Sequence, residues 1–386
     1  MIYLDNAATS WPKPPCVTRA IVEFLDQIGA NPGRAGHKLA IRAGQSVYRA
    51  REVVAEIFNA PDPLRIVFGY NITEALNLCL HGIMLPGDHV ITGSMEHNSM
   101  IRPLRQLQKQ GIEVSVVHCD NMGRLNPADI EAHIRPNTKL VAISHASNVV
   151  GTLVPVQEIG GICRENGILL LVDTAQSAGC YPVDMQKDMI DLLGFTGHKS
   201  LYGPTGTGGL IIGERVEEKQ IKPLKQGGTG SHSEHEEQPS FLPDAFESGT
   251  LNAMGLAGLT AGVEWILHEG LSNIRSHEIN LTGKLIDGLK QIPGCTVYGT
   301  LDAKEQTAIV SFNLQGMDSS EVGYRLDEEY DILCRIGLHC SPLAHQTIGT
   351  FPKGTVRLGL SYFNTEEEIE RVIEAVTGLS KEIDNG

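Results

Sequence analysis

Seven short apolar runs, separated by segments with helical spacing, constrain the fold of this chain more than any other feature. The runs are RIVF (65–68), HVITGSM (89–95), VSVVH (114–118), KLVAIS (139–144), ILLLVD (168–173), IDLLGF (190–195) and GLIIG (209–213). Strands that are apolar on both faces and alternate with helices are typical of a mainly parallel sheet covered by helices. The pattern therefore predicts an α/β fold.

The pattern changes from about residue 255. We expect long helices near 255–270 and 275–291, strands at TAIVSFNL (307–314) and GTVRLGL (354–360), and a final helix over 365–382. Such an arrangement is typical of a smaller α+β domain. We predict a large domain over residues 15–255 and a small C-terminal domain over residues 256–386, to which residues 1–14 return.

Charge and cysteine content narrow the class of protein. The chain carries 46 acidic and 31 basic residues, for a net charge of −15, which argues against binding to nucleic acid or to a membrane surface. MIYLDNAATS lacks the basic start and apolar core of a signal peptide, and the longest apolar runs are strand-sized. The eight cysteines form no CxxC pair, so we expect reduced thiols in a cytoplasmic protein.

Polar side chains follow five of the predicted strands, at the point where each strand ends. They are Thr73, which comes with the helix-start amides of Ile72 and Thr73, then His97, then Asn148, then Asp173 with Gln176, and finally Thr196, His198 and Lys199. Taken alone, each fits ordinary turn or capping chemistry. Because the carboxyl ends of parallel strands meet at one edge, where ligands bind in such sheets, we expect these side chains to converge on one site.

Pyridoxal 5′-phosphate is the one ligand that accounts for this set. Its aldehyde needs a lysine amine, its pyridinium nitrogen a carboxylate, its ring a stacking partner, and its phosphate a helix N-terminus. We therefore expect Lys199 to bond to the aldehyde, Asp173 to hold the pyridinium proton, and His97 to stack on the ring. Gln176 and Asn148 reach the phenolate oxygen in this interpretation, and the phosphate contacts are Ile72, Thr73, Thr196 and His198.

Other ligands fit the sequence less well. The glycines of GPTGTGG (203–209) precede a strand rather than opening a helix, and GHKS lacks the spacing of a Walker loop. In GGTGSHSEHEEQP (227–239), loose metal-ligand spacing at His232, Glu234, His235 and Glu236 is better explained as a solvated loop or hairpin. No metal site is expected.

Several stretches resemble one enzyme family. They are YLDNAATS, NITEALN, MEHNS, SHASNVVGT, LLVDTAQSAG, FTGHKSLYGPTGTGGL, FESGTLN, RIGLHC and VRLGLSYFNTEEEI, and they span essentially the whole chain. The chain resembles fold-type I, pyridoxal-phosphate-dependent enzymes of the class V aminotransferase superfamily. Within it, the cysteine desulfurases and selenocysteine lyases are the most similar, and RxGxHC with few loop residues resembles the group II (SufS-type) branch.

The resemblance implies further roles. It implies a homodimer with sites at the interface, in which Thr250 of FESGTLN reaches the phosphate of the partner's cofactor. It also implies that Arg357 binds the substrate carboxylate, a role that suits the bidentate donors of a guanidinium. In the family, the residue at Cys340 accepts sulfur from the substrate as a persulfide.

The residues around Cys340 leave three interpretations. A nucleophilic thiolate needs a lowered pKa or a nearby base, and Arg335, His339 and His345 are close in the sequence. A structural thiol is the alternative that we favour for Cys334. A zinc site formed by Cys334, His339, Cys340 and His345 matches no common ligand spacing.

We predict a cysteine desulfurase that converts L-cysteine to L-alanine, with Lys199, Cys340 and His97 as catalytic residues. Asn148, Arg335 and Arg357 are the expected substrate contacts. The segment NPGRAGHKLA (31–40) departs from the usual family wording and adds Arg34 and His37 as candidates at the substrate entrance. The residues after Cys340, SPLAHQTIGTFPKGT (341–355), depart from it as well. The two departures leave selenocysteine, cystine or another β-substituted amino acid open as the substrate.

The rival hypotheses are another pyridoxal-phosphate enzyme, such as an aminotransferase, lyase or epimerase, and a non-catalytic partner of a sulfur-accepting protein.

Overall fold

A seven-stranded sheet forms the centre of the larger domain, in a computed structural model that describes residues 1–33, 36–231 and 234–385. Every strand pair is parallel except the two that involve β8, which confirms the predicted α/β fold with a mainly parallel sheet. Each of the seven apolar runs supplies one strand. In spatial order they are β2 (Ile66–Gly69), β8 (Gly208–Ile212), β7 (Leu192–Thr196), β6 (Leu169–Asp173), β5 (Thr138–Ser144), β3 (His89–Gly93) and β4 (Glu113–Val117).

Helices cover both faces of this sheet because side chains alternate along each strand. In β6, Leu170 and Val172 pack into the cluster on one face, whereas Leu171 packs into the cluster on the other. The large-domain helices of the first cluster are α1 (Pro15–Gln27), α2 (Lys38–Phe58), α5 (Pro127–Ala132), α6 (Val156–Glu165) and α7 (Ala253–Glu269). Those of the second are α3 (Ile72–Ile83) and α4 (Asn98–Gln108).

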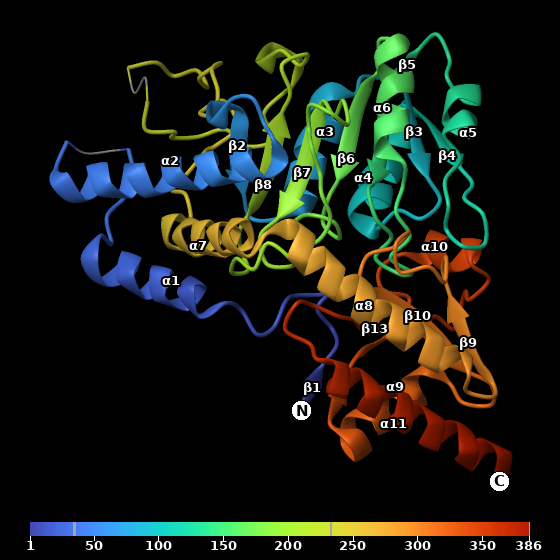
Figure 1. Cartoon of the computed structure of the whole chain (residues 1–386). Coiled ribbons are helices and arrows are strands. Elements are labelled where there is room, and N and C mark those ends of the chain that lie inside the picture. The colour runs from blue at the N-terminus through green and yellow to red at the C-terminus, as the bar shows by residue number, and fades with distance from the viewer. Residues whose placement is uncertain (34–35, 232–233, 386) are drawn as a thin grey trace.

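The smaller domain is built on an antiparallel four-stranded sheet that lies below the large sheet in Figure 1. Its strands, in spatial order, are β12 (Arg335–Gly337), β13 (Thr355–Gly359), β10 (Ile309–Leu314) and β9 (Cys295–Tyr298). Its helices are α8 (Leu271–Lys290), α9 (Ser319–Tyr330), α10 (Pro342–Thr347) and α11 (Glu366–Asn385). The chain's first strand, β1 (Ile2–Tyr3), pairs in parallel with β11 (Ile332–Leu333).

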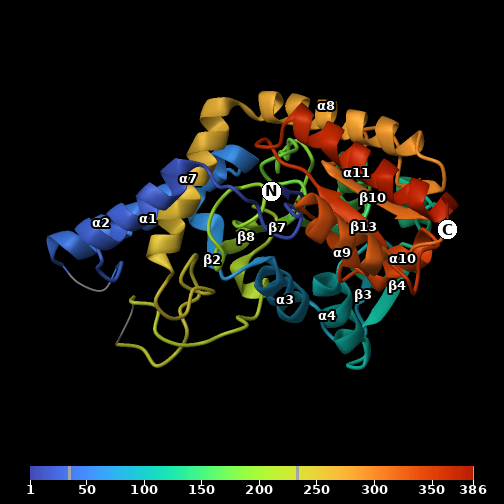
Figure 2. The same cartoon turned by 90° about the horizontal axis from the view of Figure 1, so that it is seen from below.

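The two domains share the N-terminal segment and the path from α7 to α8. Ile2 and Leu4 lie in the hydrophobic cluster of the small domain, whereas α1 packs against α7 beside the large sheet. The view from below separates α1, α2 and α7 from the small-domain elements, with the N-terminus between them (Figure 2). The residue limits 15–255 and 256–386 stay a prediction.

Sequence periodicity misses the shortest elements. Strands β11 and β12 have two and three residues, and α10 has six. Helix α9 has only two buried side chains, Val322 and Leu326, which is too few to give a clear apolar period. None of the described helices is long and apolar enough to cross a membrane.

Candidate active site

A cavity of about 290 Å³ lies at the carboxyl edge of the large sheet, opposite the small domain. Parallel strands deliver their following loops to this edge, and β12 and β13 face it from the other side. The predicted side chains that line it are Ile72, Thr73, His97, Asn148, Asp173, Gln176, Thr196, His198, Lys199, Arg335 and Arg357. The convergence predicted from the strand ends is therefore present in the structure.

One end of the cavity is suited to an anion. Helix α3 begins there at Ile72, capped by the Asn71 side chain, which accepts a hydrogen bond from the Glu74 amide at 3.1 Å. Two buried polar atoms in the wall, Thr196 Oγ1 and His198 Nδ1, have no hydrogen-bond partner among the described residues. A helix N-terminus flanked by unpartnered polar atoms is an arrangement that fits a phosphate group.

A buried carboxylate and an amine stand on neighbouring loops in the middle of the cavity. Asp173 ends β6 and is 5% exposed, and its Oδ1 accepts the Ala175 amide at 2.8 Å. Burial raises the pKa of the Asp173 carboxyl, while the Ala175 hydrogen bond and the charge of Lys199 lower it. A cationic ring nitrogen at this carboxylate offsets the cost of burying its charge. The residues present thus fit a pyridinium ring.

Lys199 follows β7, lines the cavity and is partly buried. Burial lowers its pKa from 10.5 to about 8, and the charges of Arg357 and Arg335 act in the same direction, whereas Asp173 opposes them. A pKa near 8 leaves an appreciable neutral fraction at neutral pH. Lys199 is therefore suited to act as a nucleophile and as a base.

The His97 imidazole is neutral in this setting. His97 is the N-cap of α4, and its Nδ1 accepts the Ser99 amide at 3.1 Å. Burial and the neighbouring Lys199 and Arg335 lower its pKa to about 4. Because its Nδ1 is fixed by the cap, the ring is held in one orientation at the cavity wall.

Two arginines line the small-domain side of the cavity. Arg335 and Arg357 are paired directly across β12 and β13. Arg357 is 1% exposed, and its guanidinium binds Asp5 Oδ1 and the Asn148 carbonyl oxygen, each at 2.9 Å. Its Nε has no partner among the described residues, so donor capacity for a carboxylate remains.

Cys340 is exposed and lies in the turn between β12 and α10, beside the residues that line the cavity rather than among them. The Arg335 guanidinium contacts its sulfur at 3.6 Å. His339, which does line the cavity, is buried, and burial with the charge of Arg357 lowers its pKa to about 2. His339 is therefore neutral, and Arg335 is the cation next to the thiol.

The predicted carboxamide side chains of Gln176 and Asn148 already form hydrogen bonds within the protein. Gln176 donates through Nε2 to the Ala7 carbonyl at 3.0 Å. Asn148 donates through Nδ2 to the His339 carbonyl and accepts the Ser341 hydroxyl, both at 2.7 Å. One N–H and part of the oxygen's capacity remain on each side chain for a ligand.

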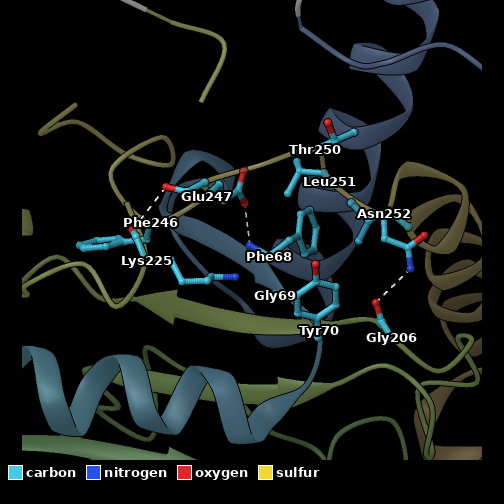
Figure 3. Close-up of a pocket in the computed structure, with 12 residues that line it drawn as sticks. Phe68, Gly69, Tyr70, Gly206, Lys225, Phe246, Glu247, Thr250, Leu251 and Asn252 are labelled. Carbon is cyan, nitrogen blue, oxygen red and sulfur yellow. Dashed lines mark hydrogen bonds between the residues drawn. The ribbon is translucent and has the colours of Figure 1, made fainter. Parts of the chain in front are cut away.

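Besides Cys340, two of the predicted residues lie away from the lining of this cavity. Thr250 is exposed and lines a separate pocket beside Tyr70, Lys225 and Phe246 (Figure 3). His37 is exposed at the start of α2, where its Nδ1 accepts the Ala40 amide at 3.2 Å. Arg34 lies outside the described residues, as does His232 of the polar loop.

Two acidic residues that contact the cavity lining are not among the site residues expected from the sequence. Asp5, in YLDNAATS, pairs with Arg357 across 352 positions of the chain. Glu96, immediately before His97, accepts the Ser144 amide at 2.9 Å and the Ser144 hydroxyl at 2.6 Å, and burial raises its pKa to about 8. An acidic residue in a conspicuous motif was the only available signal for either. Among the described residues, no group of three or more His, Cys, Asp or Glu side chains could hold a metal ion.

Comparisons with known proteins agree on one family. Residues 2–372 match the sequence profile of the aminotransferase class-V family. A probable cysteine desulfurase of Methanothermobacter thermautotrophicus is 37% identical, over 98% of this chain and 95% of the relative. The apo structure of a cysteine desulfurase from Thermococcus onnurineus NA1 has a TM-score of 0.93 at 34% identity, covering 99% of this chain and 95% of that one.

A more distant structure keeps the same fold. The Escherichia coli cysteine desulfurase CsdA, described as its S-sulfonic acid form, has a TM-score of 0.85 at 28% identity, covering 99% of this chain and 94% of that one.

Proposed function

The chain belongs to the class-V aminotransferase family, and from this premise we propose that it is a pyridoxal-phosphate-dependent cysteine desulfurase that transfers sulfur to Cys340. The observation that carries the proposal is the joint position of three groups. Lys199 and Asp173 line one cavity, and an exposed thiol lies in a short turn beside the same cavity, in contact with Arg335. Relatives named cysteine desulfurase support the activity.

The residues present are suited to hold the cofactor. Asp173 would pair with its ring nitrogen, His97 would lie against its ring, and Gln176 and Asn148 would contact its phenolate oxygen. Thr73, Thr196, His198 and the first amides of α3 would bind its phosphate. When bound, the cofactor supplies an electron sink that stabilises negative charge at the substrate's α-carbon.

Substrate binding, proton transfer and attack on sulfur are carried out by different residues of the protein. Arg357 binds the substrate carboxylate and fixes its orientation, with Arg335 as a second cation nearby. Lys199, neutral in an appreciable fraction because its pKa is about 8, accepts the α-proton and later returns it. The Cys340 thiolate attacks the substrate sulfur. The sulfur–sulfur bond forms as the Cβ–sulfur bond breaks, and the electron pair of the broken bond stays on the substrate. Its Cβ takes up a proton equivalent to the one that the Cys340 thiol lost, so cysteine and the Cys340 thiol give alanine and a Cys340 persulfide without an external oxidant.

The short turn that carries Cys340 supports assignment to the group II branch. Only Leu338 and His339 separate Cys340 from the end of β12, and α10 begins two residues after it. A tight connection of this kind contrasts with the longer, mobile loop of the other branch.

A homodimer is part of the proposal. Helices α1 and α2, which both pack on α7, expose large apolar side chains, namely Val22, Leu25, Leu39, Ile41 and Tyr48. Exposed apolar surface of this kind is typical of a protein interface. Thr250 is exposed and lines a different pocket from Lys199, which is consistent with a contact to the partner's cofactor rather than its own.

The physiological setting is also proposed. An exposed acceptor thiol suits transfer of the persulfide sulfur to an acceptor protein. The eight free cysteines are consistent with a reducing compartment such as the cytoplasm.

A product assay tests the proposed reaction. The purified protein with bound cofactor is incubated with cysteine and a reductant, and alanine and sulfide are measured. Equal amounts of the two products support a desulfurase, whereas a 2-oxo acid would indicate an aminotransferase. A parallel assay with selenocysteine decides whether selenocysteine lyase activity accompanies or replaces the reaction.

A further inference from the structure

The turn that carries Cys340 has an unusual backbone conformation. His339 and Cys340 have φ angles of +47° and +60°, and the turn is closed by a hydrogen bond from the Ser341 amide to the Leu338 carbonyl at 2.8 Å. Two central residues with positive φ make the turn of the kind that Asn-Gly pairs usually form. Residues with a side chain seldom adopt this conformation, so neighbouring groups must hold the turn in place.

Two residues of the large domain hold both carbonyl groups of the turn. The Asn148 Nδ2 donates to the His339 carbonyl at 2.7 Å, and the Asn98 amide donates to the Cys340 carbonyl at 2.8 Å. Asn148 follows β5, and Asn98 begins α4. The thiol therefore depends on the large domain for its position, although it belongs to the small domain.

Ser341, the residue after Cys340, adds a hydrogen bond from the turn to the Asn148 side chain. It is fully buried, and its hydroxyl donates to Asn148 Oδ1 at 2.7 Å. Ser341 stands at the N-cap of α10, where a serine side chain usually accepts a backbone amide, but it makes no such capping bond. Its hydroxyl therefore binds Asn148 beside the turn and does not cap helix α10.

Asn148 also contacts the predicted carboxylate anchor. Its main-chain carbonyl accepts Arg357 Nη1 at 2.9 Å. The same residue thus binds the Cys340 turn through its side chain and Arg357 through its backbone. This gives a continuous path of hydrogen bonds from the substrate's expected carboxylate position to the thiol.

From these contacts we infer that Ser341 and Asn148 are positioning residues, which clamp the left-handed His339–Cys340 turn and thereby aim the thiol at substrate held by Arg357. The inference rests on the proposed desulfurase function for its effect on turnover. The clamp itself does not depend on that function, so the two can be tested separately.

Ser341→Ala removes one half of the clamp without touching the cofactor. The matched control is Ser380→Ala, which removes another buried serine hydroxyl in the same domain, bonded to the Pro293 carbonyl at 2.6 Å. Both variants are purified with cofactor and checked for unchanged cofactor absorbance. Hydrogen exchange is measured on peptides that cover the turn, and kcat and KM for cysteine are determined from alanine formation.

Ser341→Ala should exchange the amides of the turn several-fold faster and lower kcat about tenfold, the size expected for one buried hydrogen bond, with KM nearly unchanged. Ser380→Ala should leave the exchange of the turn and kcat unchanged. Unaltered exchange of the turn in Ser341→Ala would overturn the clamp, and faster exchange with wild-type kcat would overturn its positioning role. A wild-type protein that forms no alanine would instead refute the proposed function, and the exchange rates would still decide whether the clamp exists.

Discussion

Asp5 Oδ1 lies 2.9 Å from Arg357 Nη2, so the predicted anchor for the substrate carboxylate already has a carboxylate partner in the protein. The Arg357 side chain is 1% exposed and that of Asp5 is 26% exposed. Asp5 is the only carboxylate that the described residues pair with the Arg357 guanidinium. Loss of that carboxylate would leave a buried cation without a counter-charge, which is strongly destabilising.

Removing the charge of Asp5 should destabilise the protein. We expect Asp5→Asn to lower the free energy of unfolding by roughly 2 kcal/mol, because a buried guanidinium loses its ionic partner while the side chain keeps its shape. The measurement is urea unfolding of the protein with bound cofactor. Asp331→Asn, which removes an exposed partner of the N-terminal amine, serves as the control and should change the free energy by less than about 0.5 kcal/mol.

An amino-acid ligand should recover part of this loss. Its carboxylate replaces the missing charge, so alanine should stabilise Asp5→Asn more than it stabilises the wild type. Equal stabilisation of the two proteins would mean that Arg357 is not the carboxylate site.

The pKa of Lys199 predicts how cofactor attachment depends on pH. The amine of the folded, cofactor-free protein loses its proton near pH 8 instead of 10.5, and only the neutral amine attacks an aldehyde. The rate of attachment should rise with pH up to about 8 and then level off. A midpoint near 10.5 would contradict the environment described for Lys199.

The lowered pKa of Lys199 also makes the stability of the cofactor-free protein depend on pH. Between pH 8 and 10.5 the unfolded chain holds the Lys199 proton that the folded chain has released, so this group raises the stability of the cofactor-free protein as pH increases through that window. Lys199→Ala should lack this contribution.

Borohydride should no longer fix the cofactor to that variant, and fixation to the same extent as in the wild type would rule out Lys199 as the attachment site.

Asp173 should control reactivity rather than cofactor attachment. Asp173→Asn removes the carboxylate that favours a protonated ring nitrogen, an effect of about 1 to 3 pKa units, so activity should fall roughly 10- to 1000-fold. The cofactor should still attach to Lys199. Asp191→Asn changes another buried carboxylate, paired with Arg215 outside the cavity, and should retain the wild-type rate per folded protein. Comparable losses in both variants would argue for a structural role.

Subunit mixing tests the role of Thr250. Thr250→Asp should weaken cofactor binding through repulsion of the phosphate, whereas Ser248→Asp in the same segment should not. Mixed with Lys199→Ala protein under conditions of subunit exchange, Thr250→Asp should regain activity, since a hybrid dimer has one site free of both changes. A mixture no more active than its components would contradict a contact across the interface.

Features that follow from the general geometry of a parallel sheet can be predicted from the sequence, whereas individual contacts between residues far apart in the chain cannot. The strand ends are predictable because a parallel sheet brings them to one edge whatever the connecting helices are. Lys199, Asp173 and His97 therefore line one cavity as expected, and their roles in the reaction stay predictions. The pairing of Asp5 with Arg357 and of Asn148 with Ser341 joins residues 352 and 193 positions apart. No local pattern records such contacts. Thr250 was assigned through the family resemblance alone, and its role stays a prediction.

The fate of the substrate sulfur decides whether Cys340 is the sulfur acceptor. In a single turnover with cysteine and no reductant, we expect one alanine per site and a Cys340 peptide heavier by one sulfur atom. Cys340→Ala should keep the cofactor and form almost no alanine, whereas Cys334→Ala should behave as the wild type. Alanine formation by Cys340→Ala at the wild-type rate, with no sulfur added at position 340 in the wild type, would contradict sulfur transfer to Cys340.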